Sequence, residues 1–221
     1  MNKNAIKRYA VWARSELIDR VSKKAMRYGI APDIHADPKA DSVDGRLLSD
    51  TEKKQRAALI KRVAAYGYEQ TMEEAAYTWF NRFAALRFME VNGYLPSHVR
   101  VFTNDAGEFK PQILSEAIHL DLPGLDKEKV YALKEANDEE ALFRYLIIVQ
   151  CNALNEILPG MFQRLEDFTE LLLPDNLLRA GSVIERLVKQ GDSDSIPEED
   201  WRDQVQIIGW LYQYYNTALN E

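Results

Sequence analysis

The chain has 221 residues, of which 46% are hydrophobic and 29% are charged, and this composition is ordinary for a soluble globular protein. Its longest apolar stretch, Leu146 to Leu158, is too short and too polar to cross a bilayer. The first ten residues lack the apolar core of a secretory signal, and the single cysteine, Cys151, excludes an internal disulfide. We therefore expect a cytoplasmic protein with no membrane contact.

The net charge of −7 is unevenly distributed. Residues 1–66 hold 15 Lys and Arg against 8 Asp and Glu, whereas residues 67–221 hold 13 against 27. Such asymmetry is a weak indication of nucleic-acid or partner contact at the basic end, because most basic helical segments are simply solvated.

The first predicted helix runs from about Asn2 to Tyr28, since apolar residues recur there at spacings of three and four. Gly29 supplies its C-terminal stop. Residues 30–49, rich in proline and aspartate, are expected to form a long loop. A second helix is predicted from Ser49 or Asp50 to about Tyr66.

Later helix starts are marked by the capping-box spacing, in which a cap side chain and an acid three residues on satisfy two backbone amides. The pairs are Thr71 with Glu74, Asn137 with Glu140, Ser182 with Glu185, and Ser195 with Glu198. The long helices expected from them run from Thr71 to about Val91, from Asp138 to Leu158, and from Trp201 to about Tyr215. The first of these is expected to be buried on most sides, because aromatic and aliphatic residues cover more than half its circumference.

Strand-like alternation is scarce, and its best instance is the stretch from His98 to Asn104. We therefore predict an all-α, multi-helix bundle-like fold with at most one small hairpin near residues 98–110. One helical domain over residues 1–221 is the default interpretation. It would consist of a basic helical pair, 1–66, packed on an acidic helical core, 67–221.

The sequence offers no candidate for a catalytic, cofactor-binding or metal-ligating residue. No two glycines are separated by one residue, so the tight turn of a nucleotide or S-adenosylmethionine site is missing. No two prolines are adjacent, which excludes the Asn/Asp-Pro-Pro-aromatic motif of amino-methyltransferases. One cysteine and three scattered histidines cannot form a zinc site of the usual type. The loop from Pro32 to Lys39 contains His35, Asp37 and an Asp-x-Lys triplet, but it lacks the strands of a metal nuclease.

Several side chains have a structural interpretation. His98 and His119 are expected at the surface, and Cys151 is expected as a buried, inert thiol. The arginines on buried helices, Arg82, Arg87 and Arg144, need partners. Internal ion pairs with residues such as Glu74, Glu90 or Glu140 are favoured, and contact with a neighbouring domain is the alternative. The last helix carries aromatic residues on every face, so either this domain or a further one must cover it.

Three segments resemble the adenine-specific DNA methyltransferases of BREX phage-defence systems (the PglX type), specifically their N-terminal region. They are NKNAIKRYAVWARSELIDRV (Asn2 to Val21), YTWFNRFAALRFMEVNGYLPSHVRVF (Tyr77 to Phe102) and IGWLYQYYN (Ile208 to Asn216). The resemblance implies a large cytoplasmic enzyme that transfers a methyl group from S-adenosylmethionine to the N6 amino group of adenine in DNA. It also implies that the cofactor and base-binding motifs lie outside this chain, which alone is expected to be inactive.

Two roles remain open for such a helical part. It could support the catalytic domain and contact the backbone of double-stranded DNA, or it could dock other BREX proteins through its acidic helices. A third idea, DNA mimicry, has little support because the acids are interleaved with core residues. The candidate contacts to the DNA backbone are Lys3, Lys7, Arg8, Arg14, Lys53, Lys54, Arg56, Lys61 and Arg62.

Overall fold

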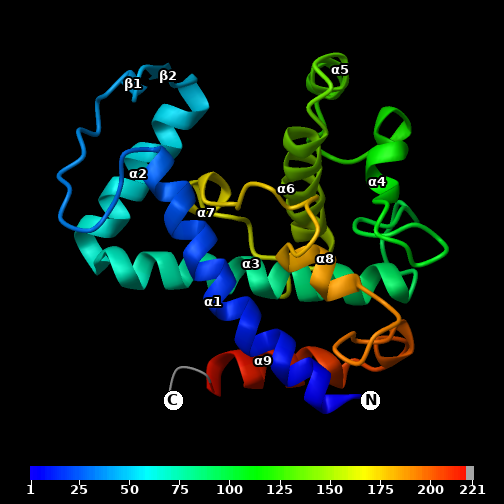
Figure 1. Cartoon of the computed structure of the whole chain (residues 1–221). Helices are drawn as coiled ribbons and strands as arrows, with labels where there is room; N and C mark the ends of the chain where they lie inside the picture. The colour runs from blue at the N-terminus through cyan, green and yellow to red at the C-terminus, as the bar shows by residue number, and fades with distance from the viewer. Residues whose placement is uncertain (218–221) are drawn as a thin grey trace. The chain divides into compact units, whose positions relative to one another are not determined.

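The structure, a computed structural model, describes residues 1–217, and helices dominate it (Figure 1). The longer helices are α1 (Lys3–Arg27), α2 (Asp50–Tyr66), α3 (Tyr68–Val91), α5 (Lys127–Glu135), α6 (Glu139–Ile157) and α9 (Gln206–Thr217). The shorter ones are α4 (Gln112–Ser115), η1 (Ala117–His119), α7 (Asp167–Leu171), α8 (Val183–Val188) and η2 (Glu198–Asp200). Two short strands, β1 (Ser42–Val43) and β2 (Arg46–Leu47), pair antiparallel. The expected all-α fold is confirmed.

The chain forms two compact units. Unit 1 consists of Met1–Arg14, Asn81–Arg164 and Asn176–Glu221, and unit 2 consists of Ser15–Phe80 and Leu165–Asp175. Because the boundaries fall inside α1 and α3, each of these helices contributes to both units. The arrangement of residues 1–66 on residues 67–221 as one domain stays a prediction.

The first two helices begin and end as expected. At the end of α1, Gly29 adopts a φ of 76°, and the amide of Ile30 donates to the carbonyl of Ala25 at 3.1 Å. At the start of α2, the amide of Glu52 donates to Ser49 Oγ and the amide of Ser49 donates to Glu52 Oε1, both at 3.1 Å. These reciprocal bonds form a complete capping box, which fixes the point where the long loop ends.

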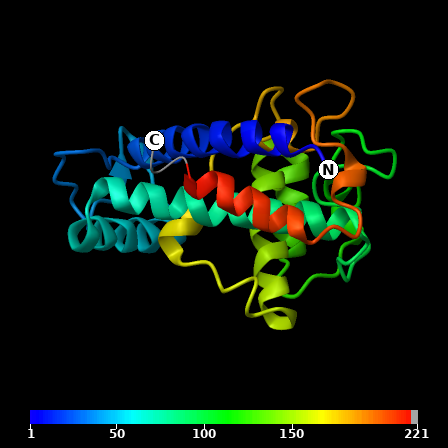
Figure 2. The ribbon, with the colours of Figure 1, turned by 90° about the horizontal axis from the view of Figure 1, so that it is seen from below.

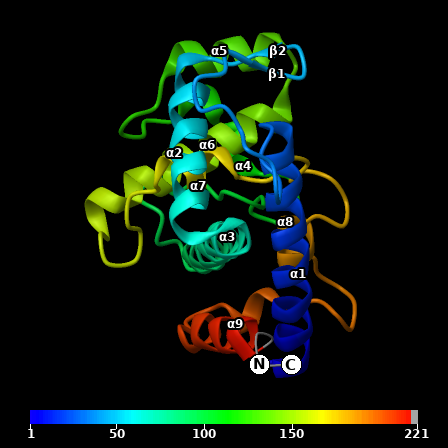
Figure 3. The same ribbon diagram turned by 90° about the vertical axis from the view of Figure 1, so that its left-hand side faces the viewer.

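The small hairpin lies at β1 and β2, near the N-terminal end of α2 (Figure 3), and not near residues 98–110. Its turn residues, Asp44 and Gly45, have φ of 50° and 78°. Positive φ at both positions is the geometry of a two-residue type I′ turn, for which Asp-Gly is a preferred sequence. The signal was therefore present in a loop that was otherwise predicted correctly.

The hairpin predicted near residues 98–110 is wrong because the backbone there is bound in another way. The amide of Phe102 donates to the buried carboxylate of Glu90 at 2.7 Å. The carbonyl of Thr103 accepts the amide of Gln112 at 3.1 Å, and that of Arg100 accepts the amide of Ile113 at 2.9 Å. Backbone groups that a strand partner would bind are thus already engaged by other parts of unit 1.

Of the four capping pairs, the one at Ser182 is confirmed as an N-cap, since its hydroxyl accepts the amide of Glu185 at 3.0 Å, but the Glu185 carboxylate accepts the amide of Gly181 and not that of Ser182. Thr71 is not a cap, because α3 begins three residues earlier and the Thr71 hydroxyl donates to the carbonyl of Gly67 at 2.7 Å. The cap of α6 is Asp138, one residue after Asn137, which adopts a left-handed φ of 53°.

The fourth pair, Ser195 with Glu198, is also wrong, since Glu198 is the first residue of η2 and its carboxylate binds Arg100. The last long helix starts at Gln206 rather than Trp201. The side chain of Asn92 holds the intervening turn by donating to the carbonyl of Trp201 and accepting the amide of Asp203, at 2.9 and 2.7 Å.

Buried aromatic residues form much of each core, and Trp79, Phe80 and Phe83 on α3 are buried as predicted. In unit 2, the indole of Trp79 donates to the carbonyl of Thr169 at 2.9 Å, which fastens α7 beside α2. In unit 1, α9 lies close to the first turn of α1 (Figure 1, Figure 2), where Lys3 Nζ stands 4.0 Å from the centroid of the Trp210 ring.

Candidate functional site

A cluster of buried charges lies in unit 1, at the C-terminal part of α3. Arg87 and Glu90 are fully buried, and Arg87 Nη1 lies 2.8 Å from Glu90 Oε2. The same carboxylate accepts the hydroxyl of Thr103 at 3.0 Å and the amide of Phe102 at 2.7 Å. The internal ion pair expected for Arg87 is confirmed, and a carboxylate so fully bonded acts as a structural group.

Glu198 joins this cluster from η2. Its carboxylate lies 2.7 Å from Arg100 Nη2, 3.7 Å from Arg87 Nη2 and 3.8 Å from Arg202 Nη2. Burial by itself raises the pKa of Glu198, but the hydrogen bond from Arg100 and the charges of the three arginines outweigh burial and lower it below 4.5. The network ties residues 98–104 and η2 to α3.

A pH dependence of stability follows from this pKa. A carboxyl group whose pKa is depressed in the folded state contributes stability that is fully present above its unfolded value, here 4.5, and is lost as the pH falls through the folded value. The variant Glu198→Gln is therefore expected to be less stable than the wild type at pH 7, with the difference shrinking below pH 4.5. Urea unfolding at pH 7, 5 and 3.5 measures it. A difference that stays constant over this range would contradict the assignment.

The other two arginines, Arg82 and Arg144, are less buried than Arg87. Arg82 donates to the carbonyls of Met161 and Gln163, both at 3.1 Å, so it holds the loop after α6 and not a carboxylate. Burial lowers its pKa. Arg144 lies half-buried on α6. Among the acids considered as partners, Glu74 binds Arg62, and Glu140 accepts the amides of Leu177 and Leu178.

In unit 1, the candidate DNA contacts lie on α1. Lys3, Lys7 and Arg14 share one edge of the helix by their spacing, and Lys7 is exposed. Lys3 stands over the Trp210 ring. Arg8 lies on another side of the helix and pairs with Asp194 at 3.0 Å.

In unit 2, the candidate contacts lie on α2 and differ widely in exposure. Arg56 is buried and donates to the carbonyls of Tyr28 and Asp37 at 2.7 and 2.6 Å, so it anchors the 30–41 loop. Lys53 lies 3.2 Å from Asp41, and Arg62 binds Glu74 at 2.7 Å.

Lys54 and Lys61, seven residues apart on α2, are the exposed pair of this set. The side chain of Lys54 is 78% exposed, and its amine lies 3.8 Å from Asp167, a distance at which an exposed ion pair is weak. Both lysines are thus open to solvent.

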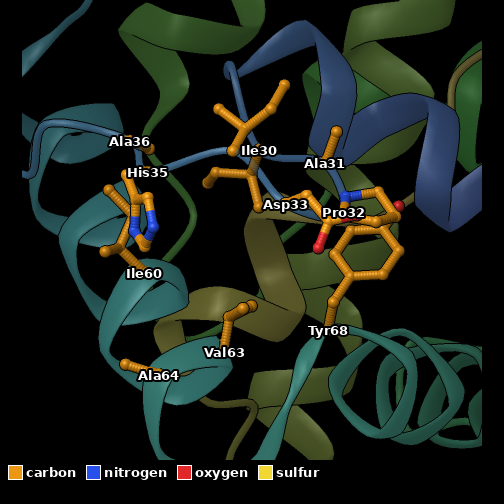
Figure 4. Close-up of a pocket in the computed structure, with 11 residues that line it drawn as sticks. Ile30, Ala31, Pro32, Asp33, His35, Ala36, Ile60, Val63, Ala64 and Tyr68 are labelled. Carbon is orange, nitrogen blue, oxygen red and sulfur yellow. The ribbon is translucent and has the colours of Figure 1, made fainter.

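A pocket of about 440 Å³ lies in unit 2, between the 30–36 loop, α2 and the start of α3 (Figure 4). Its walls are mainly aliphatic, with Ile60 and Val63 on α2 and Tyr68 on α3, and the polar lining consists of Asp33 and His35. Within residues 1–217, no group of three or more His, Cys, Asp or Glu residues could hold a metal ion. No sequence pattern indicates this pocket, because one of its walls is an irregular loop.

The remaining side chains singled out from the sequence lie as expected. His98 and His119 are exposed, and Cys151 is buried. Within residues 1–217, the helices lack the length and hydrophobicity that crossing a bilayer requires.

No model of a protein family matches the chain. It is 38% identical over 229 residues to the adenine-specific methyltransferase BrxX of Escherichia coli O9:H4 (strain HS). This chain is homologous to part of the BREX adenine-specific methyltransferases. The methyltransferase PglX of Lacticaseibacillus casei (strain Zhang) is 36% identical over 245 residues. The two alignments cover 97% and 98% of this chain but 18% and 20% of the relatives, so the chain spans about a fifth of their length.

Proposed function

We propose that these helices are a non-catalytic part of a site-specific adenine-N6 DNA methyltransferase. In this role they support the catalytic part of the enzyme and contact the DNA backbone. The main support for the proposal is the extent of the sequence alignments, since nearly the whole chain aligns with about a fifth of two methyltransferases. The sequence supports it as well, because it lacks the glycine turn of a cofactor site and the paired prolines of a base-binding motif. S-adenosylmethionine would accordingly bind elsewhere in the whole enzyme.

The DNA contact is proposed for the exposed lysines. Lys54 and Lys61 on α2, and Lys7 with Lys3 on α1, present amines at the surface of a chain whose net charge is −7. Contacts with phosphates release counterions and carry no sequence information, so we expect weak binding that salt abolishes. The sequence specificity of the enzyme would lie in other parts of it.

A salt series tests this contact. The chain is expected to retard double-stranded DNA at low salt and to release it near physiological salt. The double variant Lys54→Gln/Lys61→Gln should bind more weakly, with the slope of log K against log salt smaller in magnitude by about 0.9 for each phosphate that is no longer neutralised. The matched control is Lys110→Gln/Lys189→Gln, which removes two exposed lysines outside the basic helices. Absence of binding by the wild type at low salt, or equal slopes for both variants, would refute the proposed contact.

A further inference from the structure

The helix α9 carries more apolar residues than it buries, because it packs against the rest of unit 1 along one stripe. That stripe consists of Ile207, Leu211 and Tyr215, spaced four residues apart and at most 3% exposed. Trp210 and Tyr214, at the edge of the stripe, stack on each other with ring centroids 5.8 Å apart. Unit 1 itself therefore buries one apolar face of the helix.

A second apolar stripe lies beside the first, roughly a third of a turn around α9. It begins at Val205, one residue before the helix, and continues through Ile208 and Gly209 to Tyr212. These residues occupy positions i, i+3, i+4 and i+7, so they form one continuous ridge. Val205 is 65% exposed and Tyr212 is 50% exposed. Apolar residues with this spacing are typical of a surface that packs against another helix.

No contact within unit 1 requires a glycine at position 209, the centre of this ridge. Glycine destabilises a helix interior relative to alanine. Apart from its own stretch of helix, no atom of residues 1–217 lies within 4 Å of where a Cβ would stand, and its backbone is helical, so no positive φ requires glycine. A residue that weakens its helix without an internal reason is typical of sites where another backbone approaches closely.

We propose that the ridge formed by Val205, Ile208, Gly209 and Tyr212 is the docking face for an α-helix of the methyltransferase part. This inference rests on the proposed function. A helix of the methyltransferase part is the expected partner, because the aligned relatives carry about four fifths of their residues outside the match. The ridge also favours a helix as the partner, because its spacing and central glycine suit a close helix–helix crossing.

The test measures association between this chain and the E. coli relative from which the aligned region has been deleted, by calorimetry and by size-exclusion chromatography with light scattering. The variant Gly209→Leu places a side chain where the backbone of the partner helix would lie, and it should weaken association about tenfold or more. The matched control, Gln213→Leu, alters an exposed position of α9 outside the ridge and should bind within about twofold of the wild type. Neither variant should have a lower thermal midpoint than the wild type, because leucine forms helix better than glycine and about as well as glutamine.

The outcomes separate the inference from the proposed function. Association of the wild type together with equal affinities of the two variants would refute the docking face alone. Dimers of this chain that Gly209→Leu dissolves would also refute it, since the occupant would then be a second copy. A wild type that does not associate with the deleted relative would contradict the proposed supporting role itself.

Discussion

Replacement of Arg87 by alanine is expected to lower the free energy of unfolding by about 3–5 kcal/mol. The loss arises because Glu90 stays behind as a fully buried carboxylate, without the guanidinium that lies 2.8 Å from it. The hydroxyl of Thr103 and the amide of Phe102 still donate to Glu90, but two neutral donors do not compensate a buried charge. Urea unfolding at neutral pH measures the change.

The matched control is Arg202→Ala, which removes an arginine whose side chain is 60% exposed and which lies 3.8 Å from Glu198. This exposed pair is screened by solvent, and its loss should cost about 1 kcal/mol or less. A second comparison, Arg87→Met with Glu90→Gln, removes both charges together and should be less harmful than Arg87→Ala alone. If Arg87→Ala costs no more than Arg202→Ala, the buried pair does not hold α3 to residues 98–104.

The long helices were predictable because the physics that forms them is local. Spacings of three and four, Ser49 at the start of α2 and Gly29 at the end of α1 were all legible in the sequence, and the structure confirms them. The loops were harder to predict from the sequence, because their backbone conformation depends on groups that are distant in the chain. The alternation from His98 to Asn104 looks like a strand, yet the carboxylate of Glu90 takes its central amide. That acid lies on a helix, and only the folded chain brings it there.

The candidate site shows the same limit. The nine basic residues have the same chemistry, so composition and spacing could not rank them, and burial separates them. Arg56 anchors a loop from inside unit 2, whereas Lys61, five residues later on the same helix, is exposed. The docking ridge proposed on α9 extends an expectation from the sequence, namely that the last helix needs cover on every face. The structure was needed to identify which residues of α9 are exposed.

Truncation of Trp79 to alanine should destabilise unit 2 by about 3–5 kcal/mol, since the indole is fully buried and its loss leaves a cavity. It also removes the hydrogen bond from the indole Nε1 to the carbonyl of Thr169, 2.9 Å away. The variant Trp79→Phe separates the two effects, because it keeps most of the apolar volume and loses the donor, and it should cost about 1–3 kcal/mol.

The position of that hydrogen bond makes the prediction specific, because Thr169 lies in α7, which packs on α2 beside Lys54. Hydrogen exchange should therefore show α7 opening more readily in Trp79→Phe, while the backbone of α6 in unit 1 keeps its protection. If α7 exchanges as slowly as in the wild type, the indole does not fasten it, and the surface that carries Lys54 and Lys61 must be held by other contacts. If α7 loosens and DNA binding weakens with it, the basic face of α2 depends on this buried bond for its shape.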